Sequence, residues 1–399
     1  MRPNLQEDTA RNHHSKPPKI CVFHNIVAPY RLPLFDRLSL NYDVAVLFGL
    51  ERPADRLWTI SLDDVKFTYR ILPARLMGPL VLNPGLAVEL SRRRPDIVIH
   101  ADSDESLASM LVIFALRRLL DYKVILWVEH VPRTEAALRV TRASRRRLQW
   151  PLTQLALWVM MAVRRYGYRR ADALLSMSGP ASDAFIFSLG TSRPVFTGTQ
   201  VVPSSILASA GPRLGNRQGP IRIVFLGYLR ANKNVSSLIN AFIRTASGKE
   251  ELVIAGLGPE GEALQALAAG RNDVRFVGYV EGSEKFALLR EADLLVVPSF
   301  VEPWGLVVNE ALFYGVPVLV SRDAAASALI EHGRTGLLFN PASDDELADC
   351  LRRYFTDPDL RDQLRDGAAS MDLEIVVGVE HGIKHFEEAL TAVTGGSDQ

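Results

Sequence analysis

The sequence predicts an α/β protein with two Rossmann-like, doubly wound domains that face a central cleft. Its 399 residues, 48% of them apolar, exceed what one hydrophobic core usually organises. Short apolar runs alternate with helical patterns in both halves, as in parallel sheets that are covered on both faces. Residues 1–219 carry 30 Lys and Arg against 18 Asp and Glu, whereas residues 220–399 carry 16 against 27. The two halves therefore have net charges of about +12 and −11, which also favours two domains.

The first half contains four short apolar runs that predict buried strands. These runs are Ile20–His24, Val44–Phe48, Ile97–His100 and Val124–Val128. The spacing of apolar residues predicts helices over Pro33–Leu40, Gly85–Arg93 and Glu105–Leu120. We therefore expect a disordered start over residues 1–19, which are polar, and a Rossmann-like domain over residues 20–207.

The second half repeats the alternation more regularly. Strands are predicted at Ile221–Leu226, Glu251–Ala255, Val274–Val277, Asp293–Pro298 and Val316–Val320. Helices are predicted at Val235–Thr245, Glu260–Ala269, Ser283–Glu291, Gly305–Tyr314, Asp344–Tyr354, Pro358–Ala369 and about Val379–Val393. Residues 208–220 are rich in Gly and Pro and predict a linker. We expect the second domain over residues 221–375, followed by a helix in residues 376–399 that could pack back on the first domain.

The composition excludes several classes of protein. Cys21 and Cys350 lie in apolar stretches far apart in sequence, so we expect inert core thiols and neither a disulfide framework nor a zinc ligand set. The first 19 residues lack an apolar signal core, and no run of about 18 uncharged apolar residues occurs. We therefore expect a cytoplasmic protein that is neither exported by a signal peptide nor membrane-spanning.

The most informative segment is Asp293–Val320, which reads as strand, loop, helix, turn and strand. The start of its helix would offer the free N–H groups of Gly305, Leu306 and Val307, together with the positive end of the helix dipole, to an anion. Glu302 precedes the helix and Glu310 lies within it, and both carboxylates could accept hydrogen bonds from hydroxyl groups. A diphosphate flanked by two polyols is a nucleotide-sugar.

This segment resembles the retaining glycosyltransferases of family GT4, whose hallmark is two glutamates separated by seven residues. The surrounding pattern is also present, as Pro298-Ser299, Glu302-Pro303-Trp304-Gly305 and Asn309-Glu310-Ala311. The resemblance implies the GT-B fold, with an N-terminal acceptor domain and a C-terminal nucleotide-sugar domain. It also implies transfer with retention of anomeric configuration, with Glu302 acting at the reacting sugar and Glu310 holding the ribose.

A second match to the family is the segment Phe225–Leu229, which is followed by Lys233. It looks like the family's Gly-Arg-Leu and lysine motif, whose cations hold the donor diphosphate. Tyr228 stands where the family has arginine. Either Arg230 takes over that contact, or Lys233 acts with the helix dipole alone.

Smaller matches follow the next two strands. Gly256 and Gly258 resemble a family turn, and we interpret them as structural because a lone Gly-x-Gly marks many turns. The backbone near Tyr279 and Val280 is a candidate contact for the nucleobase.

The first half resembles the family more loosely, in particular its bacterial polysaccharide-assembly members. His130 follows a predicted strand, at the position where the family commonly keeps a histidine or acidic residue near the donor sugar, and it is our catalytic candidate in this domain. Asn25, Tyr30 and Arg31 resemble an opening motif of those members. They are candidate acceptor ligands, with a plain loop as the alternative.

Asp102-Ser103-Asp104 resembles the metal motif of a different glycosyltransferase architecture. Because these residues immediately precede a predicted helix, helix capping is the better interpretation. We expect no essential metal and no other cofactor, since the nucleotide-sugar is itself the donor substrate.

A basic segment with ten arginines and one acidic residue runs from Arg133 to Arg170. Its apolar centre, Leu148–Val163, is too short and too interrupted to span a bilayer comfortably. Arginines at positions 145, 146, 147, 164 and 165, with Trp150 and Trp158, suit a helix that lies in the interface of an anionic membrane. A core helix with solvated ends is the alternative, and no nucleic-acid motif accompanies the arginines.

We therefore expect a retaining glycosyltransferase that uses a nucleotide-sugar to elongate a lipid-linked oligosaccharide in cell-surface polysaccharide synthesis. It would work peripherally on the inner face of the cytoplasmic membrane. The alternatives are a soluble transferase for a small-molecule acceptor and a non-catalytic nucleotide-sugar-binding protein. A dinucleotide oxidoreductase is excluded because neither half has Gly-x-Gly-x-x-Gly at its first strand-helix turn.

Overall fold

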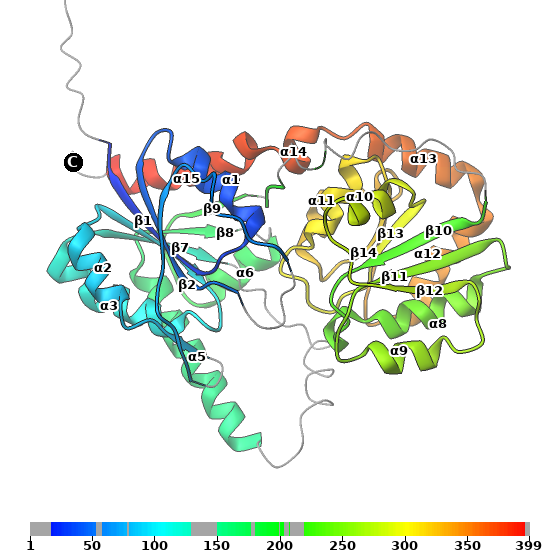
Figure 1. The fold of residues 1–399 in the computed structure, drawn as a ribbon, viewed down its shortest axis with the longest axis horizontal. Helices are drawn as coiled ribbons and strands as arrows, with labels where there is room; N and C mark the ends of the chain where they lie inside the picture. The colour runs from blue at the N-terminus through cyan, green and yellow to red at the C-terminus, as the bar shows by residue number, and fades with distance from the viewer. Residues whose placement is uncertain are drawn as a thin grey trace, which may run out of the picture.

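The computed structural model describes residues 17–52, 58–77, 80–128, 150–176, 180–198, 200–202, 207 and 219–395. The predicted disordered start falls almost entirely outside the described residues, as do positions 208–218 of the predicted linker. The described chain forms two α/β domains that lie side by side (Figure 1).

The N-terminal domain is built on a seven-stranded sheet with the order β3-β2-β1-β6-β7-β8-β9, in which every neighbouring pair is parallel. The strands are β1 (Lys19–Ile26), β2 (Asp43–Leu50), β3 (Thr68–Ile71), β6 (Ile97–Asp102), β7 (Lys123–Val128), β8 (Ala173–Ser176) and β9 (Val195–Thr197). An antiparallel hairpin of β4 (Arg75–Met77) and β5 (Leu80–Leu82) stands apart from the sheet.

Helices connect these strands and cover the sheet. They are α1 (Leu32–Leu38), α2 (Leu86–Arg93), α3 (Leu107–Leu120), α5 (Trp150–Arg170) and α6 (Pro180–Ser188), with a short 3-10 helix at Pro29–Arg31. Apolar residues of β1 alternate between two cores: Ile20 and Val22 pack on one face of the sheet, whereas Cys21 and Phe23 pack on the other. Burial on both faces is why the strands read as continuous apolar runs.

The C-terminal domain has a six-stranded parallel sheet with the order β12-β11-β10-β13-β14-β15. The strands are β10 (Ile221–Leu226), β11 (Glu250–Ala255), β12 (Val274–Gly278), β13 (Leu294–Val297), β14 (Val318–Ser321) and β15 (Gly336–Phe339). The helices are α8 (Val235–Thr245), α9 (Gly261–Leu267), α10 (Gly282–Arg290), α11 (Leu306–Phe313), α12 (Asp344–Thr356) and α13 (Pro358–Ala369), with 3-10 helices at Ala231–Lys233 and Ala325–Leu329.

The chain returns to the N-terminal domain through α14 (Leu373–Val377) and α15 (Val379–Thr394). Ile383 and Phe386 of α15 belong to the apolar core of the N-terminal domain. The ring of Phe386 meets the buried ring of Trp127 edge-on, with 4.9 Å between the centroids. Glu380 also forms an ion pair with Arg37 of α1, at 2.5 Å. The last helix is therefore an integral part of the N-terminal domain.

Loops beyond the carboxyl-terminal edges of the two sheets contact each other. Thr59, in the connection after β2, donates its backbone N–H to the Glu281 carboxylate after β12, at 2.8 Å. Because both residues follow parallel strands, the loops that carry ligands in doubly wound folds approach each other across the two domains.

The predicted alternation of strands and helices is confirmed, and most predicted boundaries lie within two residues of the observed ones. The sequence analysis missed the helices α6 and α14 and the strands β3, β4, β5, β8, β9 and β15, which are only three or four residues long. Short runs of this kind give too little periodicity to separate a strand from a loop. The two cysteines are buried, which confirms that they are core thiols, and burial raises the pKa of Cys21 to about 12 and of Cys350 to about 11.

The basic helix α5 corrects one part of the membrane hypothesis. Arg164, which we expected at the membrane surface, is only 2% exposed. Its guanidinium pairs with Asp102 at 3.1 Å and with Asp104 at 2.7 Å. The hydroxyl of Tyr168, one turn further along α5, donates to Asp102 at 2.5 Å. Arg164 therefore anchors α5 to the end of β6.

This network also overturns the capping interpretation of Asp102 and Asp104. Helix α3 begins at Leu107 with Ser106 as its N-cap, and no side-chain capping bond is made there. Both carboxylates pair with the Arg164 guanidinium, which explains why an Asp-x-Asp pattern occurs here without capping a helix.

We expect Arg164→Leu to destabilise the protein by about 3–5 kcal/mol, because it leaves the buried Asp102 carboxylate without its positively charged partner. Denaturant unfolding measures this loss. The neighbouring Arg165 is exposed, so Arg165→Leu should change stability by less than about 0.5 kcal/mol. Equal stability of the two variants would show that the buried pair does not hold α5.

Candidate active site

The N-terminus of α11 provides a site for an anion. Gly305 is the N-cap residue of this helix and has φ = 99°, a left-handed conformation that glycine adopts without strain. The first N–H groups of a helix have no partner inside it, and the helix dipole adds positive potential at the same end. Gly305, Leu306 and Val307 are the residues from which the sequence predicted phosphate contacts. The turn that begins α11 is thus chemically suited to a phosphate.

Glu302 lies in the loop between β13 and α11 and is held there by its backbone. It forms an isolated parallel bridge with Ala324, and its carbonyl oxygen accepts the N–H of Ala325 at 3.1 Å. Its carboxylate makes an ion pair with the ammonium of Lys233. The Ser299 hydroxyl approaches the same carboxylate oxygen, at 3.5 Å.

Lys233 reaches Glu302 because two loops are bound together. Asn232 accepts the N–H of Phe300 on its carbonyl oxygen at 2.9 Å and donates its side-chain amide to the Val301 carbonyl at 3.2 Å. These loops follow β10 and β13, which are neighbouring parallel strands. The structure thus brings together a cation and a carboxylate that are 69 residues apart in sequence.

Arg230 lies on the same loop as Lys233. Its guanidinium stacks over the ring of Tyr228, with 4.6 Å between the guanidinium carbon and the ring centroid. The tyrosine at the family's arginine position therefore supports the arginine that follows it two residues later. This contact leaves the replacement hypothesis for Arg230 to be tested by mutation.

Glu310 lies on α11, eight residues after Glu302, and its side chain is buried. The ammonium of Lys285, from α10, contacts the Glu310 carboxylate at 2.7 Å. The sequence analysis missed Lys285, because a lysine in an amphipathic helix carries no motif. Only the packing of α10 beside α11 shows that it belongs to this site.

Gly256 and Gly258 are structural, as the sequence predicted. A side chain at Gly256 would place its Cβ 1.8 Å from the carbonyl oxygen of Gly227, and one at Gly258 would lie 2.3 Å from that of Leu229. The loops after β10 and β11 can therefore approach each other only where there is no side chain. Tyr279, the candidate nucleobase contact, is partly exposed. Desolvation, and to a smaller extent the nearby Glu281 carboxylate, raises the pKa of its hydroxyl.

The N-terminal candidates do not form one cluster in the described residues. His130 lies outside the part of the chain that the structure describes. Asn25 donates its amide to the Glu105 carboxylate at 3.1 Å. Tyr30 meets the ring of Trp58 edge-on, with 6.4 Å between the centroids.

The structure corrects the prediction that Arg31 is an acceptor ligand. Its side chain is buried, and its guanidinium stacks on the buried Trp127 ring at 4.2 Å. This burial leaves it no surface from which to contact an acceptor in this arrangement. Arg31 therefore packs inside the N-terminal domain, and Asn25 and Tyr30 remain the accessible acceptor candidates.

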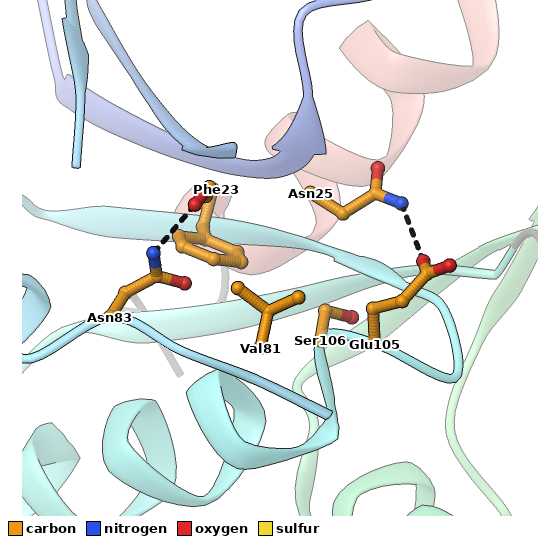
Figure 2. Close-up of a pocket in the computed structure, with 7 residues that line it drawn as sticks. Phe23, Asn25, Val81, Asn83, Glu105 and Ser106 are labelled. Carbon is orange, nitrogen blue, oxygen red and sulfur yellow. Dashed lines mark hydrogen bonds between the residues drawn. The ribbon is translucent and has the colours of Figure 1, made fainter. Parts of the chain in front are cut away.

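Figure 2 shows a small pocket at the carboxyl edge of the N-terminal sheet. It is lined by Phe23, Asn25, Gly49, Val81, Asn83, Glu105 and Ser106. The Asn83 amide, which lines one side of the pocket, already donates a hydrogen bond to the carbonyl of Gly49 at 2.6 Å. At one end of the pocket Asn25 donates its amide to the Glu105 carboxylate, so these two side chains are paired with each other in this arrangement.

No group of three or more His, Cys, Asp or Glu side chains that could hold a metal occurs within the described residues. The absence of an essential metal stays a prediction. The described helices also include none that is long and apolar enough to cross a membrane.

Comparisons with known proteins agree with this geometry. Residues 211–371 match the family profile described as glycosyl transferases group 1. Glycogen synthase of Mycobacterium tuberculosis is 30% identical over 204 residues, which are 49% of this chain and 49% of that protein. The chain thus spans about half the length of this relative.

Solved structures show the same fold over nearly the whole chain. Sucrose-phosphate synthase from Thermosynechococcus elongatus superposes with a TM-score of 0.72 at 15% identity, covering 96% of this chain and all of that one. HepE of Anabaena, solved in complex with UDP and glucose, has a TM-score of 0.68 at 16% identity and covers 94% of this chain and all of its own. At these identities the likeness shows the GT-B fold alone.

Proposed function

We propose that the chain, which has the GT-B fold and resembles group 1 glycosyltransferases over residues 211–371, transfers a sugar from a nucleotide-sugar to an acceptor with retention of anomeric configuration. One observation carries the proposal. The N-terminus of α11, the Lys233 ammonium and the Glu302 carboxylate converge, and Glu310 lies further along the same helix. Glu302, the N-terminus of α11 with Lys233, and Glu310 follow one another in the order of the sugar, the diphosphate and the ribose of a nucleotide-sugar.

Each group has a distinct task in this reaction. The N–H groups of Gly305 and Leu306, with Lys233, hold the diphosphate. Glu310 accepts hydrogen bonds from the ribose hydroxyls, and Lys285 keeps a positive charge beside its carboxylate. Glu302 accepts hydrogen bonds from hydroxyls of the reacting sugar, which fixes the sugar over the diphosphate.

The chemical step breaks the bond between the sugar C1 and the diphosphate oxygen. Negative charge accumulates on the leaving diphosphate, so positive groups placed beforehand stabilise the transition state more than the ground state. The acceptor hydroxyl attacks C1 from the face that the diphosphate leaves, and its proton passes to a diphosphate oxygen. Configuration is thereby retained, and the products are the glycosylated acceptor and a nucleoside diphosphate.

A thermal unfolding screen tests donor binding. UDP-, GDP- and ADP-sugars are added separately, and one base class should raise the melting temperature, because a ligand that binds only the native state stabilises it. The UDP and glucose bound to HepE support a nucleotide-sugar donor without deciding the base. Failure of all three classes to stabilise the protein would contradict the proposal.

We further propose that the acceptor is a lipid-linked oligosaccharide used in polysaccharide synthesis and that the N-terminal domain docks on an anionic membrane. Helix α5 extends away from the body of its domain (Figure 1). Leu155 and Trp158 are 58% and 69% exposed on it, and exposed Arg165 follows. Such a combination of apolar and basic side chains is typical of helices that bind at the membrane interface.

The β4–β5 hairpin adds a second exposed apolar group beside the pocket. Leu76 and Met77 are 71% and 60% exposed. Val81 of β5 donates its N–H to the carbonyl of Glu105 at 3.0 Å, and α5 contacts the same loop through Asp104. The hairpin and α5 thus hold the loop that lines the Asn25 pocket. If the hairpin and α5 both touch a membrane, this pocket would face it.

Replacing Arg145, Arg146, Arg147 and Arg165 by Gln should release the protein from anionic vesicles in a flotation assay. Each basic residue near such a surface contributes about 1 kcal/mol, and salt screens this attraction. Trp158→Ser should weaken binding further, because apolar insertion is lost. Arg164 is left intact because it is buried.

Leu40→Ser is the matched control, because Leu40 is an exposed leucine of the same domain outside α5 and the hairpin. It should leave flotation unchanged. If the unmodified protein ignores anionic vesicles at low salt, the soluble, small-molecule acceptor replaces the lipid-linked one.

A further inference from the structure

Helix α11 contacts both segments through which the chain crosses between the domains. The first crossing follows β9 and includes Gln200 and Leu207, and the second is α14, which leads into α15. Both crossings share one apolar core with α11. That core includes Val202, Leu207, Trp304, Val308, Leu312, Val376 and Val377.

One buried amide holds the backbone of both crossings. The Asn309 side chain has no exposed surface, and its Nδ2 donates to the carbonyl oxygens of Gln200, at 3.4 Å, and of Val376. Its Oδ1 accepts the indole N–H of Trp304 at 2.6 Å. The indole thus fixes which way the amide points, and the amide ties the crossings to α11.

Tyr314, immediately after α11, makes a second connection. Its hydroxyl donates to the carbonyl oxygen of Leu207 on the first crossing, at 2.8 Å. We call Trp304, Asn309 and Tyr314 the crossing clamp.

The crossing clamp and the donor site share one rigid element. Trp304 lies between Glu302 and Gly305 in sequence, and Asn309 precedes Glu310. A helix of eight residues moves as a unit, so its position relative to the crossings sets where the donor groups stand relative to the N-terminal domain.

We propose that Trp304, Asn309 and Tyr314 are positioning residues that set the orientation of the acceptor domain relative to the donor site. The inference rests on the proposed function for its catalytic consequence. The crossing clamp itself supplies none of the groups to which we assign the donor. Loosening it should therefore lower turnover, because reacting groups are misaligned, while donor binding is kept.

The test compares two tyrosines that make the same kind of bond. Tyr314→Phe removes the hydroxyl that binds a crossing, whereas Tyr354→Phe removes one that binds the Asp293 carbonyl within the C-terminal domain, at 2.6 Å. Trp304→Phe removes the indole N–H that orients Asn309. The native cysteines are buried, so spin labels can be attached at Val88→Cys on α2 and Ala266→Cys on α9, two exposed sites in different domains.

Double electron-electron resonance then measures the distance between the two labels. Trp304→Phe and Tyr314→Phe should broaden or shift the distance distribution relative to the unmodified sequence, whereas Tyr354→Phe should not. In transfer assays the first two variants should lose about tenfold or more in kcat with little change in the donor KM. Identical distance distributions in all variants would overturn the inference, and so would a raised donor KM with unchanged kcat.

The distance measurement needs no turnover, so it separates the two proposals. Broadened distances in a chain that never transfers sugar would contradict the proposed function and leave the role of the crossing clamp in domain orientation standing. Normal transfer with unchanged distances would support the proposed function and contradict the role of the crossing clamp in domain orientation.

Discussion

Lys233→Ala is expected to lower kcat by about 10²- to 10³-fold, because it removes a positive charge from the leaving diphosphate at the point where negative charge develops. The Lys233 ammonium already contacts Glu302 beside the N-terminus of α11, so no large movement is needed to reach a diphosphate there. Steady-state transfer or donor hydrolysis, measured with the donor found in the thermal screen, gives the value.

Lys249→Ala is the control, because Lys249 is an exposed lysine of the same domain, outside the site. Arg230→Ala belongs to the same series. A loss comparable to that of Lys233→Ala would show that Arg230 replaces the family arginine. An unaffected Arg230→Ala variant would show that Lys233 acts with the helix dipole alone. Full activity of Lys233→Ala would contradict the assignment of Lys233 to the donor diphosphate.

Glu302→Gln is expected to lower kcat by about 10- to 100-fold, whereas Glu310→Gln should mainly raise the donor KM. A hydrogen bond to a charged acceptor contributes about 1.5–3 kcal/mol, and the amide keeps the shape of the side chain but loses its charge. Glu302 should act at the reacting sugar, so its loss should destabilise the transition state and lower kcat. Glu310 should act at the ribose, which binds equally in both states.

Glu331→Gln is the matched control for this pair, because Glu331 is an exposed glutamate outside the site that forms an ion pair with the surface residue Arg334. It should leave both constants unchanged. Full transfer kinetics in both site variants would reject the central assignment, and an exchange of their effects would reverse the roles of the two glutamates.

The donor half of the site could be predicted because its residues are nearly contiguous. Glu302, Gly305 and Glu310 belong to one strand-loop-helix segment, whose order along the chain is also its order in space. Lys233 was predicted from the family motif, and the pairing of β10 with β13 explains why it meets Glu302. Lys285 could not be predicted, because its proximity to Glu310 depends only on how α10 packs beside α11.

The N-terminal half was predicted less well because residue type does not reveal burial. Arg31 was a candidate acceptor ligand and Arg164 a candidate membrane contact, yet one stacks on Trp127 and the other pairs with Asp102. An arginine can be buried when an aromatic ring or a carboxylate compensates its charge, and both partners here are distant in sequence. The same reason explains the wrong capping interpretation of Asp102 and Asp104.

The most direct test of the account follows the donor sugar itself by proton NMR, with water as the acceptor. The donor identified in the thermal screen is incubated with the protein, and the anomeric signals are recorded before mutarotation scrambles them. We predict release of the nucleoside diphosphate and a free sugar that first appears with the anomeric configuration of the donor, at a rate that falls sharply in Lys233→Ala. A sugar of inverted configuration would contradict the retaining mechanism, and a donor that binds but stays intact would show a nucleotide-sugar-binding protein instead of a transferase.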